Sequence, residues 1–225
     1  MTRVFAARFA VEASNGIAAR GRFSWALPGG SVAETFFPAL VTTAVSWTQV
    51  DFFWGDERAV GPDDPDSNYG LAKRLLLGPL RTDTRRIHRM PGEMSDLEAA
   101  ASVYEREMTS ALGDSPLIDL IVLGVGPEGH VCSLFPGHSL MRESKRRVAA
   151  ILDSPKPPPR RITFTMVPLQ EARMICVAGF GESKAQAIRD ALENPDSQTP
   201  LALALRRATR ALVLIDPAAA SLLRR

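Results

Sequence analysis

The chain has 225 residues, of which 45% are hydrophobic and 23% are charged, and its formal net charge is +2. These values are typical of a globular protein that can bury a full core, and they exclude a disordered or fibrous chain. The charge is small and no block of Lys and Arg with interleaved aromatics appears, so the composition does not indicate a nucleic-acid-binding protein.

No segment approaches the roughly 18 consecutive apolar residues that a membrane helix needs, and the first residues lack the apolar core of a signal peptide. The two cysteines, Cys132 and Cys176, have neither CxxC nor Cys/His ligand spacing, which favours reduced thiols and no structural metal. We therefore expect a cytoplasmic protein without a membrane or nucleic-acid partner, built as a single domain over residues 1–225.

Strand and helix signals alternate along the chain. After an opening helical stretch, the first half predicts a strand over 23–27, a helix over 32–44, a strand over 49–54, a helix capped by Ser67 or Asn68 that runs to 77, a weaker strand over 86–90, a helix over 95–112 and a strand over 118–123. The second half predicts strands over 147–152, 161–165, 173–178 and 211–215, helices over 168–172 and 182–192, and a short closing helix. This alternation predicts an α/β fold with a mostly parallel sheet covered by helices on both faces.

The first candidate for chemistry is LPGGS at residues 27–31, where a strand turns into a helix. Backbone N–H groups at such a helix N-terminus can bind a phosphate, although the motif alone is more typical of a tight turn with Ser31 as N-cap. GGSVA also approaches the G-x-S-x-G nucleophile elbow. The last glycine of that motif is missing and no histidine follows position 138, so we reject the serine hydrolase interpretation.

The second candidate is Gly55-Asp56-Glu57-Arg58, three charges directly after the apolar run VDFFW. They cannot belong to the core, so they mark the exit of a strand into solvent or into a cleft, and the motif alone leaves both possibilities open.

The third candidate is GVGPEGH at residues 124–130, which follows the strongest strand and satisfies the dinucleotide fingerprint G-x-G-x-x-G. Asp153 even follows at the spacing of a ribose-binding acid. However, Pro127 removes an amide from the turn and Pro136-Gly137 interrupts the helix that should follow. We therefore reject a nicotinamide cofactor and interpret this segment as a turn that presents His130.

Two basic residues are ambiguous by themselves. Lys184 lies in the first turn of a predicted helix, where a cation opposes the helix dipole by about 0.3–1 kcal/mol unless an anion lies nearby. Arg161 follows the proline-rich run 155–159, which we interpret as a rigid connection. Either side chain could point to solvent or meet a bound phosphate.

Together these motifs resemble the 6-phosphogluconolactonases. The matching blocks are LPGGS, then W-x-x-V-x-F-F-W-G-D-E-R with SN nine residues beyond the Arg, then D-L-I-V-L-G-V-G-P-E-G-H-x-x-S-L-F-P-G, then R-I-T, then G-x-x-x-K. The resemblance implies the Rossmann-like fold shared with glucosamine-6-phosphate deaminases and ribose-5-phosphate isomerases. It also implies hydrolysis of 6-phosphoglucono-δ-lactone in the oxidative pentose phosphate pathway, without metal or cofactor and with a sugar phosphate as the small-molecule partner. We expect a monomer.

The resemblance also implies roles for particular residues. His130 would be the general base that deprotonates the attacking water, and Asp56 and Arg58 would act beside it at the sugar end of the cleft. The implied substrate-binding residues are Gly29, Gly30 and Ser31 in the phosphate loop, its cationic partners Arg161 and Lys184, and Glu57, Asn68 and Gly129 around the sugar.

Two departures from the family pattern affect these roles. The phosphate loop usually reads SGGSTP, but Pro28, Val32 and Ala33 replace its Ser, Thr and Pro here. The acid before Gly-His is usually Asp, but here it is Glu128, one methylene longer. The alternatives to a lactonase are a related sugar-phosphate isomerase or deaminase and a sugar-phosphate-binding protein without catalysis.

Overall fold

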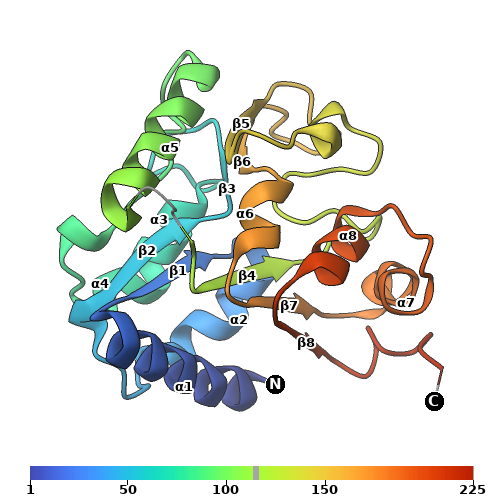
Figure 1. Ribbon diagram of the computed structural model, residues 1–225, viewed down its shortest axis with the longest axis horizontal. Helices are drawn as coiled ribbons and strands as arrows, with labels where there is room; N and C mark the ends of the chain where they lie inside the picture. The colour runs from blue at the N-terminus through green and yellow to red at the C-terminus, as the bar shows by residue number, and fades with distance from the viewer. Residues whose placement is uncertain (114–116, 225) are drawn as a thin grey trace.

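The computed structural model describes residues 1–113 and 117–224, and its main element is a five-stranded parallel sheet with the strand order β2-β1-β4-β7-β8 (Figure 1). Its strands are β1 (Phe23–Leu27), β2 (Val50–Trp54), β4 (Leu120–Gly124), β7 (Ile175–Gly179) and β8 (Ala211–Ile215). The chain winds outward from β1 in one direction and from β4 in the other. Ligands bind in such sheets outside the carboxyl ends of the strands, at the point where the winding reverses.

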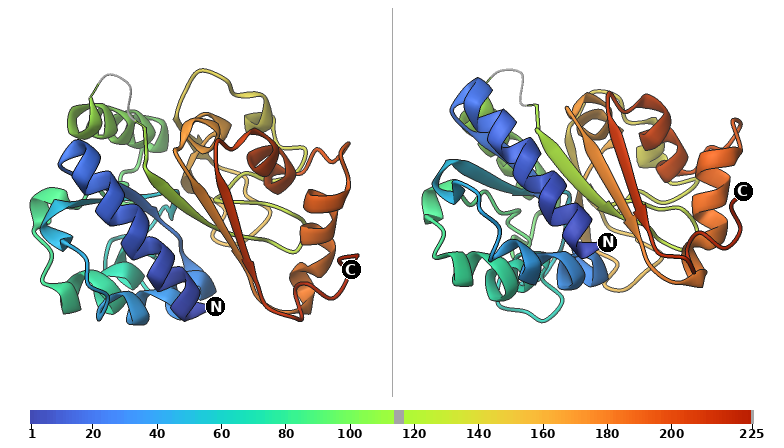
Figure 2. Two further views of the ribbon diagram at one scale, coloured as in Figure 1. Left: turned by 60° about the horizontal axis from the view of Figure 1, so that its bottom comes forward. Right: turned by 90° about the horizontal axis from the view of Figure 1, so that it is seen from below.

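Helices cover both faces of this sheet, as predicted (Figure 2). Successive strand residues alternate between the faces: Trp25 packs in one apolar cluster and its neighbour Ala26 in the other. Helices α1 to α3 contribute to the cluster around Trp25, and α5 to α8 to the opposite one. The helices are α1 (Thr2–Arg20), α2 (Gly30–Leu40), α3 (Asn68–Ala72), α4 (Gly78–Leu80), α5 (Leu97–Leu112), α6 (Met166–Glu171), α7 (Ala185–Glu193) and α8 (Pro200–Arg207).

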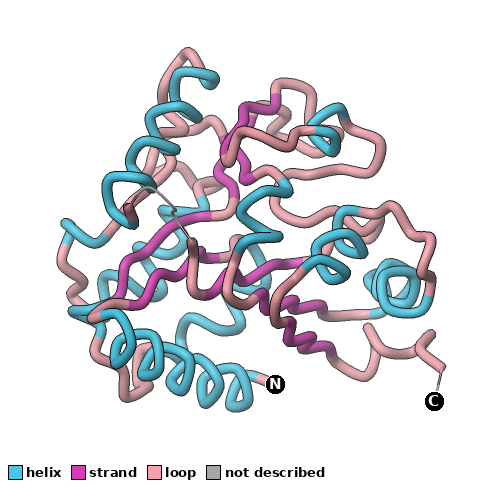
Figure 3. Tube along the Cα trace, in the orientation of Figure 1, coloured by secondary structure: helices cyan, strands magenta, loops and turns pink. Residues whose placement is uncertain are grey.

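A second, three-stranded antiparallel sheet was not predicted. It has the order β3-β6-β5 and consists of β3 (Asp56–Arg58), β5 (Val148–Ile151) and β6 (Arg161–Phe164) (Figure 3). The prediction of strands at 147–152 and 161–165 is confirmed, and the two strands pair with each other in this sheet and not in the parallel one. Residues 152–160 are too short a connection for a parallel crossover, which takes a dozen residues or more. The Gly55–Arg58 segment is likewise not a simple exit loop, because β3 pairs with β6.

Several helix predictions need smaller corrections. The predicted helix over 32–44 begins at Gly30 and ends at Leu40. Ser67 caps α3 by accepting a hydrogen bond from Gly70 N, and the chain continues as a π-helical turn over Lys73–Leu77. The segment after β8 forms turns instead of a closing helix, and α8 was not predicted.

The predicted strand over 86–90 is also wrong, because this segment makes a single bridge to the sheet. Ile87 bridges Phe52 and His88 N donates to Phe52 O at 2.9 Å. Further along β2, which contains Phe52, the Tyr104 hydroxyl accepts a hydrogen bond from Trp54 N at 2.8 Å and donates one to Trp54 O at 3.1 Å. The outer edge of β2 is therefore covered by a loop and a side chain.

Among the residues that the structure describes, no helix is both long and apolar enough to cross a membrane.

Candidate active site

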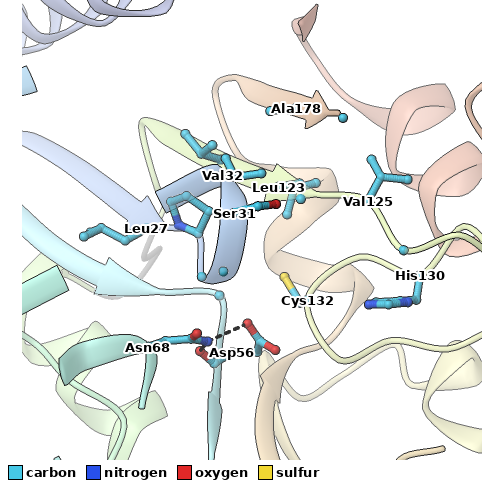
Figure 4. A pocket seen from close by; sticks show the side chains of 18 of the residues that line it. Leu27, Ser31, Val32, Asp56, Asn68, Leu123, Val125, His130, Cys132 and Ala178 are labelled. Carbon is cyan, nitrogen blue, oxygen red and sulfur yellow. Dashed lines mark hydrogen bonds between the residues drawn. The ribbon is translucent and has the colours of Figure 1, made fainter. Parts of the chain in front are cut away.

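A cavity of about 220 Å³ opens at the carboxyl ends of β1, β2, β4 and β7 (Figure 4). It lies where the winding of the parallel sheet reverses, and the small sheet forms one of its walls. Most of the predicted site residues line it: Gly29, Gly30, Ser31, Asp56, Arg58, Asn68, His130, Arg161 and Lys184. The chain segments that the sequence motifs singled out are therefore brought together, although they lie up to about 150 residues apart.

The first wall is the turn between β1 and α2. Gly30 begins the helix with a φ of +55°, a left-handed conformation that favours glycine. No side chain caps this helix, so the amides of its first turn are free to face an anion. Gly29 lies against Asn68, and a Cβ at position 29 would fall 2.0 Å from the Asn68 Oδ1 atom. These contacts account for the paired glycines and favour phosphate binding at the turn.

The second wall presents Asp56 through a fixed network. Asn68 Nδ2 donates to the Asp56 carbonyl at 2.8 Å and to its Oδ1 at 3.2 Å. Ser133 Oγ donates to the other carboxylate oxygen at 2.7 Å. Both oxygens are thus held, and the carboxylate cannot turn freely. Arg58 Nη1 donates to the Asp66 carbonyl at 2.8 Å, while its Nε is buried without a hydrogen-bond partner.

Glu57 does not line the cavity, in contrast to the role that the resemblance implies. Because β3 is a strand, Asp56 and Arg58 share one face and Glu57 lies on the other, where it is 2% exposed. Its carboxylate accepts hydrogen bonds from Arg58 N, Asn68 N and Tyr69 N at 2.8 Å each and from Ser67 Oγ at 3.0 Å. Glu57 therefore holds the start of α3, and with it Asn68, against the cavity.

His130 is placed by the turn after β4. Gly126 N donates to the His130 carbonyl at 2.9 Å, and the imidazole lies so close to Gly126 that a Cβ there would fall 1.8 Å from His130 Nδ1. Phe135 packs against the ring, with centroids 4.7 Å apart. The side chain is 17% exposed and its Nδ1 is buried, which leaves Nε2 as the nitrogen that a water in the cavity can reach.

Burial and charged neighbours, among them Glu128 and Lys156, act on the imidazole of His130. Burial lowers the pKa of His130 below its ordinary value and outweighs the opposing effect of the nearby Glu128 carboxylate. Glu128 Oε1 lies 3.2 Å from Nδ1. A neutral imidazole with its proton on Nδ1 has a free lone pair on Nε2, as a general base requires.

Gly129 does not line the cavity either. It adopts a φ of +85° and lies behind the turn, where a Cβ would meet Thr199 at 3.0 Å. Its carbonyl accepts a hydrogen bond from Leu201 N at 3.0 Å. Gly129 therefore joins the His130 turn to the start of α8.

Arg161 and Lys184 differ in their freedom to bind an anion. Arg161 is 4% exposed, and its guanidinium donates to the carbonyls of Lys156, Pro157 and Pro158. Its direct contact with a phosphate stays a prediction. Lys184 lies before α7 at the cavity, and burial and the neighbouring Lys156 lower its pKa. Within the described part of the chain, no carboxylate lies within 4 Å of the Lys184 ammonium.

Sequence reasoning missed Lys156 and Cys132, which also line the cavity. Lys156 is the single charged residue in the run Pro155–Pro159, and that isolation was its signal. Cys132 has a φ of +50°, and burial raises the pKa of its thiol. Among the described residues, no group of three or more His, Cys, Asp or Glu side chains could hold a metal ion.

The fold and the site define a Rossmann-like α/β protein in which a helix N-terminus and a histidine line one cavity. The family model described as "Glucosamine-6-phosphate isomerases/6-phosphogluconolactonase" matches residues 1–213, and the chain belongs to this family. It is 38% identical to the 6-phosphogluconolactonase of Streptomyces coelicolor, covering 100% of this chain and 91% of that protein.

Two solved structures show the same architecture. A 6-phosphogluconolactonase from Trypanosoma brucei superposes with a TM-score of 0.85 at 25% identity, covering 100% of this chain and 96% of that one. A monomeric glucosamine-6-phosphate deaminase superposes with a TM-score of 0.81 at 26% identity, covering 97% and 94%. The family and the Rossmann-like fold class predicted from the sequence motifs are confirmed.

Proposed function

We propose that this protein hydrolyses 6-phosphoglucono-δ-lactone to 6-phosphogluconate, the ring-opening step of the oxidative pentose phosphate pathway. The observation that carries the proposal is a partly exposed His130, whose pKa is lowered by burial, in the same cavity as an uncapped helix N-terminus. The relatives named 6-phosphogluconolactonase, 38–39% identical to this chain, support the choice of substrate.

The mechanism begins with orientation. The amides of the Gly29–Ser31 turn and the ammonium of Lys184 bind the phosphate, which fixes the lactone carbonyl near His130. Asp56, held by Asn68 and Ser133, accepts a hydrogen bond from the sugar hydroxyls.

The chemistry then needs one base. His130 Nε2 takes a proton from water as the water oxygen bonds to C1 of the lactone, and the carbonyl electrons move onto its oxygen. Arg58 or nearby backbone amides donate hydrogen bonds to that oxyanion. When the oxyanion collapses, the bond between C1 and the ring oxygen breaks, and the imidazolium returns its proton to the departing alkoxide. The step requires no covalent intermediate, metal or cofactor.

The test uses lactone made in situ from glucose 6-phosphate, with its hydrolysis followed against the spontaneous background. We expect a rate well above background for the wild type and a loss of roughly 10²–10⁴-fold in kcat for His130→Gln. 6-Phosphogluconate should still bind the variant, because the phosphate site is unchanged. A wild-type rate equal to background would refute the activity, and an unchanged variant would refute the base.

A second candidate is deamination of glucosamine 6-phosphate, which the likeness to the monomeric deaminase favours. Ammonia release from that sugar phosphate, with no acceleration of lactone hydrolysis, would establish it. A protein that binds 6-phosphogluconate but converts neither compound would be a sugar-phosphate-binding protein. A cytoplasmic location and a monomeric state stay predictions, and light scattering tests the second.

A further inference from the structure

The buried Nδ1 of His130 faces a carboxylate that a lysine also contacts. Nδ1 is buried without a well-aligned hydrogen-bond partner, and its nearest acceptor is Glu128 Oε1 at 3.2 Å. Lys156 Nζ lies 3.1 Å from both oxygens of the same carboxylate. Because an unpaired buried N–H is costly, Glu128 is the group that stabilises a proton on Nδ1. Lys156 competes with His130 for Oε1.

Lys156 is held in this position by Arg161. The guanidinium donates to the carbonyls of Lys156 at 3.1 Å, Pro157 at 2.9 Å and Pro158 at 2.9 Å. The Lys156 carbonyl also accepts from Ser154 Oγ at 3.0 Å. A buried arginine thus fixes the backbone of the loop and leaves the lysine side chain directed into the cavity.

The Lys156–Glu128 contact is poorly suited to stabilising the fold. The two side chains are 38% and 37% exposed, and exposed ion pairs contribute only about 0–1 kcal/mol. A contact of little stability that is directed at a catalytic base is better explained by its effect on that base.

We infer that Glu128 and Lys156 are positioning residues for His130, acting as an opposed pair. Glu128 keeps the proton on Nδ1, so that Nε2 accepts the proton of water. Lys156 limits the negative charge that Glu128 exerts on the ring and so disfavours its protonated form. The inference rests on the proposed function, in which His130 is the base.

The inference is testable because Glu128 and Lys156 should shift the pKa of His130 in opposite directions. The charged groups that act on the imidazole are Glu128 and Asp56, which favour its protonated form, and Lys156, which disfavours it. Removing Lys156 should therefore raise the pKa of His130, and neutralising Glu128 should lower it. Glu128 Oε1 lies 3.2 Å from Nδ1, Lys156 Nζ lies 3.1 Å from that oxygen, and both charged side chains are partly exposed, so each shift should be on the order of 0.5 pH unit.

The experiment measures kcat/KM for the lactone against pH in the wild type, Lys156→Met and Glu128→Gln, and the His130 ring protons by NMR titration. We expect the acidic limb and the NMR titration to move up in Lys156→Met, to move down in Glu128→Gln, and to return to the wild-type position in Lys156→Arg. Glu128→Gln should also lower kcat with little change in KM. Lys73→Met is the matched control, because it removes an exposed Lys–Asp ion pair and the same charge at a residue that does not line the cavity.

Shifts of the same sign in both variants, or no shift in either folded variant, would overturn the inference. The NMR titration does not depend on turnover. If the wild type fails to hydrolyse the lactone, the proposed function is wrong, while the opposed shifts still decide whether the pair acts on His130.

Discussion

Gly126→Ala is predicted to disable catalysis without unfolding the protein. A Cβ at this position would fall 1.8 Å from Nδ1 and 2.1 Å from Cε1 of His130, whereas ordinary contacts begin at 3.4 Å. The ring must therefore retreat by about 1.5 Å, and a misplacement of even about 1 Å can cost roughly 10²-fold in rate. We expect kcat to fall by at least that factor.

The assay separates this effect from unfolding and from loss of binding. Gly126 does not have a left-handed φ, so alanine fits its backbone conformation, and overpacking should cost only about 1–3 kcal/mol. The thermal midpoint should fall by several degrees, and 6-phosphogluconate should bind as before. Gly61→Ala, whose Cβ would meet nothing within 4 Å, is the control and should behave as wild type. A folded Gly126→Ala protein with the wild-type kcat would show that His130 does not act from this position.

Three further predictions concern stability and binding. The Glu57 carboxylate accepts four hydrogen bonds, and Glu57→Gln replaces one of its oxygens with an NH₂ group that can only donate. Thermal denaturation should therefore show a loss of about 2 kcal/mol or more in the free energy of unfolding, and substrate binding should weaken. An unchanged thermal midpoint would contradict this account. Burial alone would lower the pKa of His88, but Asp51 and Glu107 outweigh it and raise the pKa, so this group stabilises the fold fully below its ordinary pKa and less as pH rises through the raised one. The difference in thermal midpoint between wild type and His88→Asn should therefore be larger at pH 6 than at pH 8.5, and a difference that is the same at both values would exclude a role for its protonation. Ser31→Ala should raise KM without a burst of product, because the hydroxyl lies at the phosphate turn and is not a nucleophile; a loss confined to kcat would favour the esterase mechanism.

The sequence predicted the parallel sheet well because its strands are buried on both faces. Strands of that kind appear as short apolar runs that end at glycine or charge, as in VDFFW before Gly55. The small sheet could not be predicted in the same way, since its pairing depends on the length of the connection between β5 and β6 and on the bend at Gly55. The helix α8 did carry a signal, a Thr199 cap followed by Pro200, but its LALAL run also alternates like a strand.

The site was predictable where a motif named the residue and less so where orientation decided its role. His130, Asp56 and Lys184 line the cavity as expected. Glu57 does not, because a strand puts neighbouring side chains on opposite faces, and Gly55–Arg58 was not recognised as a strand. Lys156 was missed since its place depends on Arg161, a contact across a loop that no spacing in the sequence indicates.

The covered edge of β2 has a consequence for association between copies of the chain. An unpaired strand edge is a template for aggregation, and β2 is the outermost strand on its side of the parallel sheet. His88 N donates a hydrogen bond to the Phe52 carbonyl, and the Tyr104 hydroxyl is hydrogen-bonded to both the N–H and the carbonyl of Trp54. A strand from another molecule therefore finds these hydrogen-bonding positions occupied.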